Sequence, residues 1–281
     1  MTQVHVHPAP ADTGTGSGSL AEPYAAALAI LAAGVYLLAA RRLRHRGDAW
    51  PWPRDVAFTT GCITLTCAVS GPLPGGPFTA HMTQHLIVGM AAPLLLVLAR
   101  PLTLALRSTP PGRVRRGLLA MRNARPLHLL LFPPVAAVLD IGGLWLLYRT
   151  ALFSAAQHQP LPHAVTHAHV LAAGLLFTFT VCQLDPVRHR WSLAVRGPSL
   201  LAVGAGHSVL AKSLYAAPPP GTAFTTSDLH TGAQLMYYGG DLVEISLAAV
   251  LAVQWYTTTG RAAARVFSAQ EIDRPRTRPS K

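Results

Sequence analysis

The sequence predicts an all-α integral membrane protein, a bundle of seven transmembrane helices with its N-terminus outside the cytoplasm and its C-terminus inside. Composition supports this class first, because only 12% of the 281 residues are charged and 51% are hydrophobic, whereas a globular domain carries about a quarter charged residues. Seven apolar segments are also long enough, or nearly so, for the roughly 20 residues that a bilayer crossing takes. Finally, the basic residues are concentrated in alternate loops.

The apolar segments follow one another along most of the chain, at residues 21–40, 55–71, 79–98, 126–148, 163–182, 197–215 and 229–256. The second is the weakest because it is short and rich in threonine, although a threonine hydroxyl can bond back to its own helix. The fourth contains Pro133 and Pro134, which remove backbone donors and are expected to kink it. We predict a transmembrane domain at 21–257, between a flexible extracytoplasmic tail at 1–20 without a cleavable signal peptide and a basic cytoplasmic tail at 258–281.

Arginine and lysine predict the orientation of the bundle. The connections after the first, third and fifth segments, together with the C-terminal tail, hold 21 of the 23 basic residues. The alternate connections hold only Arg149, and Lys212 lies within the sixth segment. Positive charge is retained on the cytoplasmic side of a membrane. The expected location is therefore the bacterial inner membrane, with the N-terminal tail and the even-numbered connections outside.

The same pattern argues against several classes of protein. The basic residues form no single face or stripe, so nucleic acid is not an expected partner. The apolar segments make the lipid bilayer the expected partner instead. The three cysteines, Cys62, Cys67 and Cys182, give no paired motif that would indicate a disulfide framework. The chain has no nucleophile–base arrangement and no phosphate-binding loop, so we do not expect an enzyme.

Histidines are concentrated on the predicted outer side, which holds ten of the 13. His81 and His85 are four residues apart at the outer start of the third segment, so one helical face presents both. His163 and His167 repeat that spacing at the outer start of the fifth. Neutral imidazole is the commonest protein metal ligand and suits copper, zinc, iron and nickel. Two such pairs on one side of the membrane predict a metal site there.

Further residues extend the candidate ligand set. His230 begins the seventh segment two residues after Asp228, and both join the two histidine pairs as predicted ligands. Secondary candidates are two more histidines and two methionines, whose thioethers would favour Cu(I). They are His169, His207, Met82 and Met236.

Ionisable residues also occur inside the predicted spans. His230, Gln234, Tyr237, Asp241 and Glu244 share one arc of the seventh helix, which must face protein or water because lipid penalises each polar group. Asp140 and Lys212 are the expected partners of this stripe. Two interpretations remain open, a functional polar path and a structural ion pair that fixes helix register.

Three segments together resemble a known family, the CtaG-type membrane assembly factors of caa3-type cytochrome c oxidase. The third span reads HMTQHLIVGMAAPLLLVLARP, with the H-M-x-Q-H-L motif of that family followed by Ala-Pro, leucines and a terminal proline. PLPHAVTHAHVLAAGLLF is similar to its second histidine pair, and DLHTGAQLMYYGG to its last motif. The resemblance covers about residues 78–257.

The resemblance implies that the protein binds copper and supports copper insertion into a haem-copper oxidase, with an oxidase subunit as partner. The residues that carry over are His81, His85, His163, His167 and Asp228. Three positions depart from the family pattern. Arg100 stands where the family usually has glycine, Tyr237 where tryptophan is common, and His230 where glutamine is expected.

Two other functions fit the same residues. A copper transporter or copper-tolerance protein would need a polar path through the bundle, which Asp140, His207, Lys212, Asp241 and Glu244 could supply. A membrane metal-dependent oxidoreductase would use the histidines as haem or metal ligands. Cellular copper uptake distinguishes the first alternative from an assembly factor, and a visible absorption spectrum distinguishes the second.

Overall fold

The structure is a computed structural model that describes residues 21–122 and 125–272, and every regular element in these residues is helical. The elements are α1 (Ala21–His45), α2 (Trp52–Ser70), α3 (Pro77–Leu86), η1 (Ile87–Ala91), α4 (Ala92–Leu98), α5 (Pro101–Ser108), α6 (Arg113–Arg122), α7 (Arg125–Leu130), α8 (Pro133–Arg149), α9 (Leu152–His158), α10 (Pro160–Cys182), α11 (Leu193–Ala216) and α12 (Thr226–Ile272). The expected all-α class is confirmed. The predicted N-terminal tail at 1–20, which holds His5 and His7, two of the ten histidines predicted on the outer side, lies outside the described residues.

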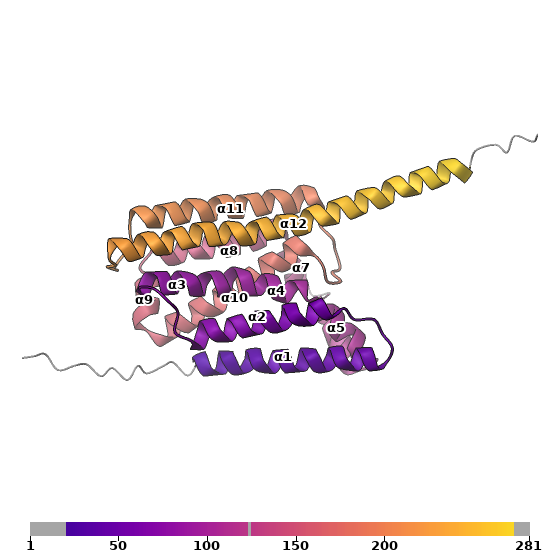
Figure 1. Cartoon of the computed structure of the whole chain (residues 1–281), viewed down its shortest axis with the longest axis horizontal. Coiled ribbons are helices and arrows are strands. Elements are labelled where there is room, and N and C mark those ends of the chain that lie inside the picture. Colours follow the sequence, from indigo (N-terminus) through magenta and orange to yellow (C-terminus); the bar gives the residue numbers. More distant parts are fainter. Residues whose placement is uncertain (1–20, 123–124, 273–281) are drawn as a thin grey trace, which may run out of the picture.

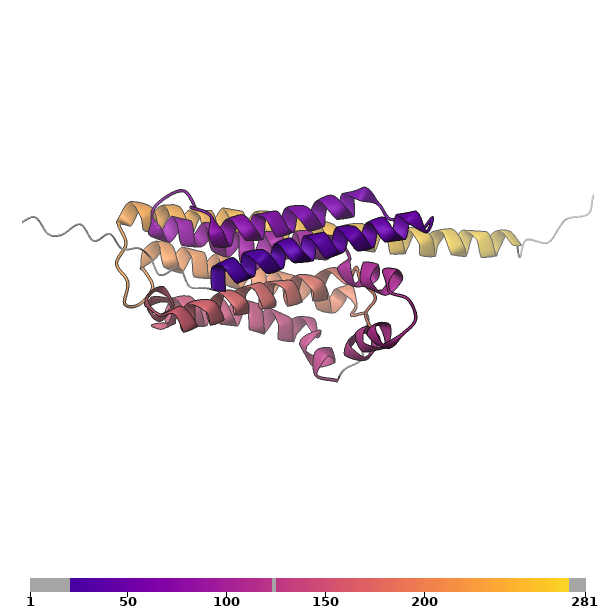
Figure 2. The same cartoon turned by 90° about the horizontal axis from the view of Figure 1, so that it is seen from below.

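The long helices run side by side along the long axis of the molecule (Figure 1). α1 packs against α2, α2 against α4, α3 against α12, and α8 against both α10 and α11, while α11 and α12 form the most extensive pair. α3, α10 and α12 begin at the same end, at the left of Figure 1, which we call the histidine end. α12 continues past the bundle at the opposite end, where the short helices α5–α7 gather (Figures 1 and 2).

The predicted segments all fall on helices, with the fourth divided between α7 and α8, but fewer helical runs meet the length and hydropathy that a membrane crossing requires. Four helical runs are long and apolar enough to cross a membrane: Pro23–His45, Pro77–Leu98, Pro160–Cys182 and Thr226–Gly260. α8 becomes a fifth candidate if it is taken with α9, from which it is bent by 76°. α2 and α11 pack within the bundle but are not among these candidates. Seven crossings and the orientation of the termini therefore stay predictions.

Prolines shape two of the helical runs. The expected kink at Pro133 is a complete break, because α7 ends at Leu130 and Pro133 opens α8 at the first helical position, where its missing amide hydrogen is not needed. Within the third run, Pro93 cannot donate to the carbonyl of Gly89. The helix widens there into the π-helical turn η1, in which the amide of Ala92 donates to the carbonyl of Ile87. Such π turns occur frequently at functional sites.

The π turn packs directly against the backbone of α10. A Cβ atom added at Gly174 would overlap the carbonyl of Gly89. Glycine at position 174 is therefore required by the close approach of the two helices, as is common where membrane helices meet. This contact fixes the depth of α10 relative to α3, and with it the relative depth of the histidines that the two helices carry.

Two aspartates from distant parts of the chain, Asp228 in α12 and Asp185 in the connection from α10 to α11, cap the start of two helices. Asp228 of α12 accepts hydrogen bonds from the amides of Phe78 (2.9 Å) and Thr79 (3.0 Å) and from the hydroxyl of Thr79 (2.6 Å). At the opposite end, Asp185 accepts hydrogen bonds from the amide (2.7 Å) and hydroxyl of Thr103 in α5. The first amides of a helix have no partner within that helix, so both carboxylates satisfy donors that would otherwise be free.

A second polar contact joins α10, α11 and α12 near the opposite end. The buried Arg196 guanidinium donates to the carbonyl of Val181 (2.8 Å) and to Oε1 of Gln254 (2.9 Å). The amide nitrogen of Gln254 in turn donates to the carbonyl of Cys182 (2.6 Å). These are the last carbonyls of α10, which have no donor in their own helix.

Four apolar clusters of buried residues occur in the described part of the chain, and the two with the most residues lie along the core of the bundle. The one at the histidine end combines residues of α3, α8, α9, α11 and α12, among them Phe78, Tyr148 and Leu210. Met82 and Met236 are 0% exposed within it. Both methionines among the secondary ligand candidates therefore pack in the core. The second cluster lies nearer the opposite end and is built from α4, α8, α10, α11 and α12.

Candidate functional site

The histidine end holds an open cavity of about 720 Å³ between the starts of α3 and α10 and the short helix α9. His81, Gln84, His163 and His167 line it. Gln84 donates to the last-turn carbonyl of Ala68 in α2 at 2.9 Å, which ties that wall of the cavity to its neighbour. The two predicted histidine pairs therefore contribute three residues to one cavity.

Three of the predicted ligands converge in this cavity. The ring centroids of His163 and His167 are 4.3 Å apart, as expected for neighbours one turn apart on α10. The His167 ring lies 6.5 Å from that of His81, which belongs to α3. We call His81, His163 and His167 the outer cluster. The i,i+4 spacing predicted that each pair shares a helix face, and the packing of α10 against η1 and α4, which continue the run begun by α3, brings the two faces together.

Tyr148 holds one member of the outer cluster in place. Its hydroxyl lies 3.0 Å from Nε2 of His81, and it is fully buried in the apolar core. When Nε2 donates the hydrogen, Nδ1 of His81 keeps the lone pair that a metal ligand needs. The sequence did not indicate this tyrosine, because it lies beside Arg149 with no spacing that relates it to His81.

His85 lies one turn deeper than His81 and contacts a different histidine. Its ring centroid is 6.0 Å from that of His207 in α11, and the two rings are inclined by 26°. His85 is 5% exposed and His207 1%. Nδ1 of His207 lies 3.6 Å from Oε1 of Glu244 in α12. We call His85, His207 and Glu244 the inner cluster. It contains one primary ligand, one secondary candidate and one intramembrane polar residue of the sequence prediction.

The other predicted residues lie elsewhere. Asp228 caps α3, as described above, and His230 stacks on Tyr215 at 3.9 Å between ring centroids. Neither lines the cavity of the outer cluster. Lys212 lies over the ring of Tyr237 at 5.3 Å.

The expected ion pairs of the polar stripe are not formed. Within the described chain, Lys212 makes no salt bridge with Asp140, Asp241 or Glu244. Glu244 instead meets His207. Asp140 lines a small cavity beside the inner cluster together with His169.

The donor chemistry fits a metal, although the side chains are not closed around one. Among the described residues no group of three His, Cys, Asp or Glu side chains is placed as a ready metal site. Both ring nitrogens of His85 are nevertheless buried without a hydrogen-bond partner, and buried polar groups normally have one. The ring centroids of the outer cluster are 4.3 and 6.5 Å apart, so closure of these histidines around a metal requires side-chain movement.

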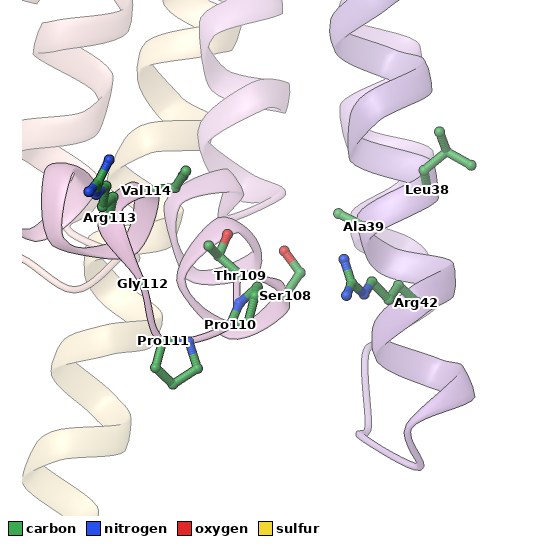
Figure 3. Close-up of a pocket in the computed structure, with 10 residues that line it drawn as sticks. All are labelled: Leu38, Ala39, Arg42, Ser108, Thr109, Pro110, Pro111, Gly112, Arg113 and Val114. Atoms are coloured by element: carbon green, nitrogen blue, oxygen red, sulfur yellow. The ribbon is translucent and has the colours of Figure 1, made fainter.

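A separate pocket, of about 430 Å³, has a different character (Figure 3). It lies at the end opposite the histidines, between α1 and the connection from α5 to α6. Arg42 and Arg113 supply its charge, and Leu38 and Val114 its apolar walls. It contains no histidine, cysteine or carboxylate, so it does not compete with the histidine end as a metal site.

Comparisons with known proteins agree with the resemblance noted in the sequence. The model of the family described as cytochrome c oxidase caa3 assembly factor (Caa3_CtaG) matches residues 34–258. Uncharacterized proteins of Mycobacterium bovis and Mycobacterium tuberculosis are each 31% identical over 261 residues, which is 85% of this chain and 39% of each relative. One of Mycobacterium leprae is 28% identical over 246 residues, 80% of this chain and 37% of the relative.

The chain thus spans about two fifths of the length of the curated relatives it matches. No solved structure matches it. The family match extends from the middle of α1 into the long α12 helix and includes both histidine clusters. This multi-pass, all-helical chain therefore belongs to the cytochrome c oxidase caa3 assembly factor (Caa3_CtaG) family.

Proposed function

We propose that the protein binds copper at its outer cluster, on the extracytoplasmic side of the bacterial inner membrane, and supports copper insertion into cytochrome c oxidase. Family membership supports the role in oxidase assembly. The observation that carries the copper proposal is the convergence of His81, His163 and His167 from two helices on one open cavity. Imidazole is a ligand type that copper prefers.

An open site suits transfer rather than storage. The cavity of about 720 Å³ has room for ligands of an oxidase subunit to approach the bound copper. Transfer is then a stepwise ligand exchange, in which each imidazole that leaves the metal is replaced by a donor of the partner. Copper keeps its oxidation state throughout, so the exchange needs neither an oxidant nor a reductant.

Copper binding by purified variants tests this proposal. His167→Ala removes the residue that contacts both other members of the outer cluster. We expect its copper affinity to fall by at least about 10–100-fold, the loss that even indirect ligand contacts cause, and oxidase activity in the cell to fall with it. His45→Ala and His189→Ala, on histidines at the opposite end, are the controls. Equal copper affinity in all three variants would contradict the proposal.

Inward copper transport is a second candidate, favoured by the polar inner cluster. The apolar cluster between it and the opposite end opposes this candidate, because Leu200, Val203 and Leu247 close the interior there. Copper uptake by cells with and without the protein separates the two functions. Uptake that depends on the protein supports transport, and unchanged uptake with reduced oxidase activity supports assembly.

A haem-dependent oxidoreductase fits the interior poorly. His85 and His207 come from two helices, as axial haem ligands do, but the cavity beside them has a volume of only about 10 Å³, roughly that of one water molecule. A porphyrin has no room there. An absorption spectrum of the purified protein with a haem band would overturn this conclusion.

A further inference from the structure

We propose that the inner cluster is a second copper position, deeper in the bundle than the outer cluster and filled from it. This inference rests on the proposed function, because the outer cluster supplies the copper. It adds a separate site with its own ligands: two imidazoles, from His85 and His207, and the carboxylate of Glu244.

The first argument is that the inner cluster gathers buried polar atoms without partners. Both ring nitrogens of His85, both of His207 and Oε1 of Glu244 are buried and form no hydrogen bond. They are five of the eight such atoms in the described part of the chain. Unpaired buried polar atoms are destabilising, and a group of them in a native structure calls for a bound water or ion.

The second argument is the geometry of the three side chains. Nδ1 of His207 and Oε1 of Glu244 are 3.6 Å apart, which is too long for a good hydrogen bond. Two donors that are each about 2 Å from the same tetrahedral metal are separated by about 3.3 Å. The His85 ring stacks beside His207, with its centroid 6.0 Å from that of His207 and the two rings inclined by 26°. The adjoining cavity of about 10 Å³ has the size of one small ion or water molecule.

The third argument is that glycines make room for these polar side chains. A Cβ atom at Gly240 would overlap the His207 ring, and one at Gly204 would overlap the Glu244 carboxylate. The backbones of α12 and α11 thus approach the polar groups more closely than any other residue would permit. These two glycines therefore let α11 and α12 pack closely around the polar side chains of the inner cluster.

Charge also favours a cation at this position. A carboxylate in a low-dielectric interior is costly without a compensating charge, and no lysine or arginine pairs with Glu244 among the described residues. Asp140 adds a second carboxyl group beside the same small cavity. A copper ion would supply the missing positive charge and would occupy the free lone pairs of the imidazoles.

The route from the outer cluster is short. His81 and His85 are one turn apart on α3, about 6 Å along the axis, and both rings contact Tyr148. Copper can pass between them when His85 replaces a ligand of the outer cluster and then closes onto His207 and Glu244. Beyond the inner cluster the apolar core blocks further movement, so the inner position is the end of the route.

Copper stoichiometry of the full-length protein in detergent or nanodiscs provides the test, with Cu(I) under a reductant as the probe. We expect two copper ions per chain in the wild type and one in His207→Ala and in Glu244→Gln. Asp241→Asn is the matched control and should keep two, because it makes the same change one turn earlier on α12 without contacting His207. Glu244→Gln preserves shape, so it remains informative if His207→Ala fails to fold.

The outcomes separate this inference from the proposed function. One copper per chain in the wild type, unchanged in Glu244→Gln and lost in His167→Ala, would overturn the second position and leave the proposed function standing. One copper that is lost in Glu244→Gln but kept in His167→Ala would support the inner position and overturn the outer site. Wild-type protein without bound copper would overturn both.

Discussion

Replacement of Asp228 by alanine should destabilise the protein without removing its copper. The resemblance to the family places this aspartate among the metal ligands, but its carboxylate is engaged by three donors at the start of α3, at 2.6 to 3.0 Å. The variant leaves the amides of Phe78 and Thr79 without their acceptor. α3 carries His81 and His85, so loss of the cap loosens the helix that positions both clusters.

The magnitude follows from the contacts. Loss of a helix cap costs about 0.5–2 kcal/mol, and hydrogen bonds to a charged group lie at the upper part of the usual range. Because the Asp228 carboxylate is partly exposed, we expect a decrease of about 2 kcal/mol in the free energy of unfolding. For a chain of this size that corresponds to a fall of about 4–8 °C in the apparent melting temperature.

Gly76 provides an internal check through a double-mutant cycle. Its φ of −74° and ψ of 174° suit alanine, yet a Cβ atom there would overlap the Asp228 carboxyl group. Gly76→Ala should therefore destabilise the wild type by about 1–3 kcal/mol, as overpacking does. In the Asp228→Ala background that cost should disappear, because the carboxyl group is gone.

Thermal unfolding of the four proteins in one detergent at one scan rate measures this cycle, with copper content determined in parallel. An equal cost of Gly76→Ala in both backgrounds would refute the contact. An Asp228→Ala protein that melts at the wild-type temperature but has lost copper would refute the capping role and restore Asp228 as a ligand.

Three further predictions concern topology and packing. A reporter active only in the cytoplasm should work when fused after Lys281 and fail in the loop at 216–227; activity in that loop would refute the seven-span orientation. Arg196→Ala should lower the apparent melting temperature by several degrees, because it frees the carbonyl of Val181 and the side chain of Gln254; the exposed Arg190→Ala is the control, and equal melting would contradict the role of Arg196. Gly174→Ala should reduce the amount of folded protein in the membrane, because its methyl group would overlap the Gly89 carbonyl. Gly197→Ala, with no atom within 4 Å of the added Cβ, should be harmless, and similar yields of the two variants would argue against that close approach.

The sequence predicted the helices well because apolar length and period are local properties of the chain. The predicted segment 163–182 lies within α10 (Pro160–Cys182), and 79–98 within the helical run Pro77–Leu98. The i,i+4 spacing also identified the faces that carry His81 and His167. Local information was sufficient for these features, since each depends on residues within one helix.

Contacts between distant segments could not be predicted in the same way. Asp228 was grouped with His230 because they are two residues apart, but a helix turns those side chains in different directions, to α3 and to Tyr215. His85 was paired with His81, whereas its ring meets His207, more than 100 residues later. A signal for the inner cluster was nevertheless present, since Gly204 and Gly240 interrupt apolar helices, and glycine at such positions indicates close approach.

The glycines around the buried polar side chains also constrain how the sequence can change over time. Gly240 accommodates His207, Gly204 accommodates Glu244, and Gly143 accommodates the ring of His169. A larger residue at any of these glycines is compatible only with a smaller side chain at its partner, so we expect the two positions of each pair to be substituted together in divergent relatives. Co-variation of these pairs can therefore show which family members retain the buried polar interior before any of them is purified.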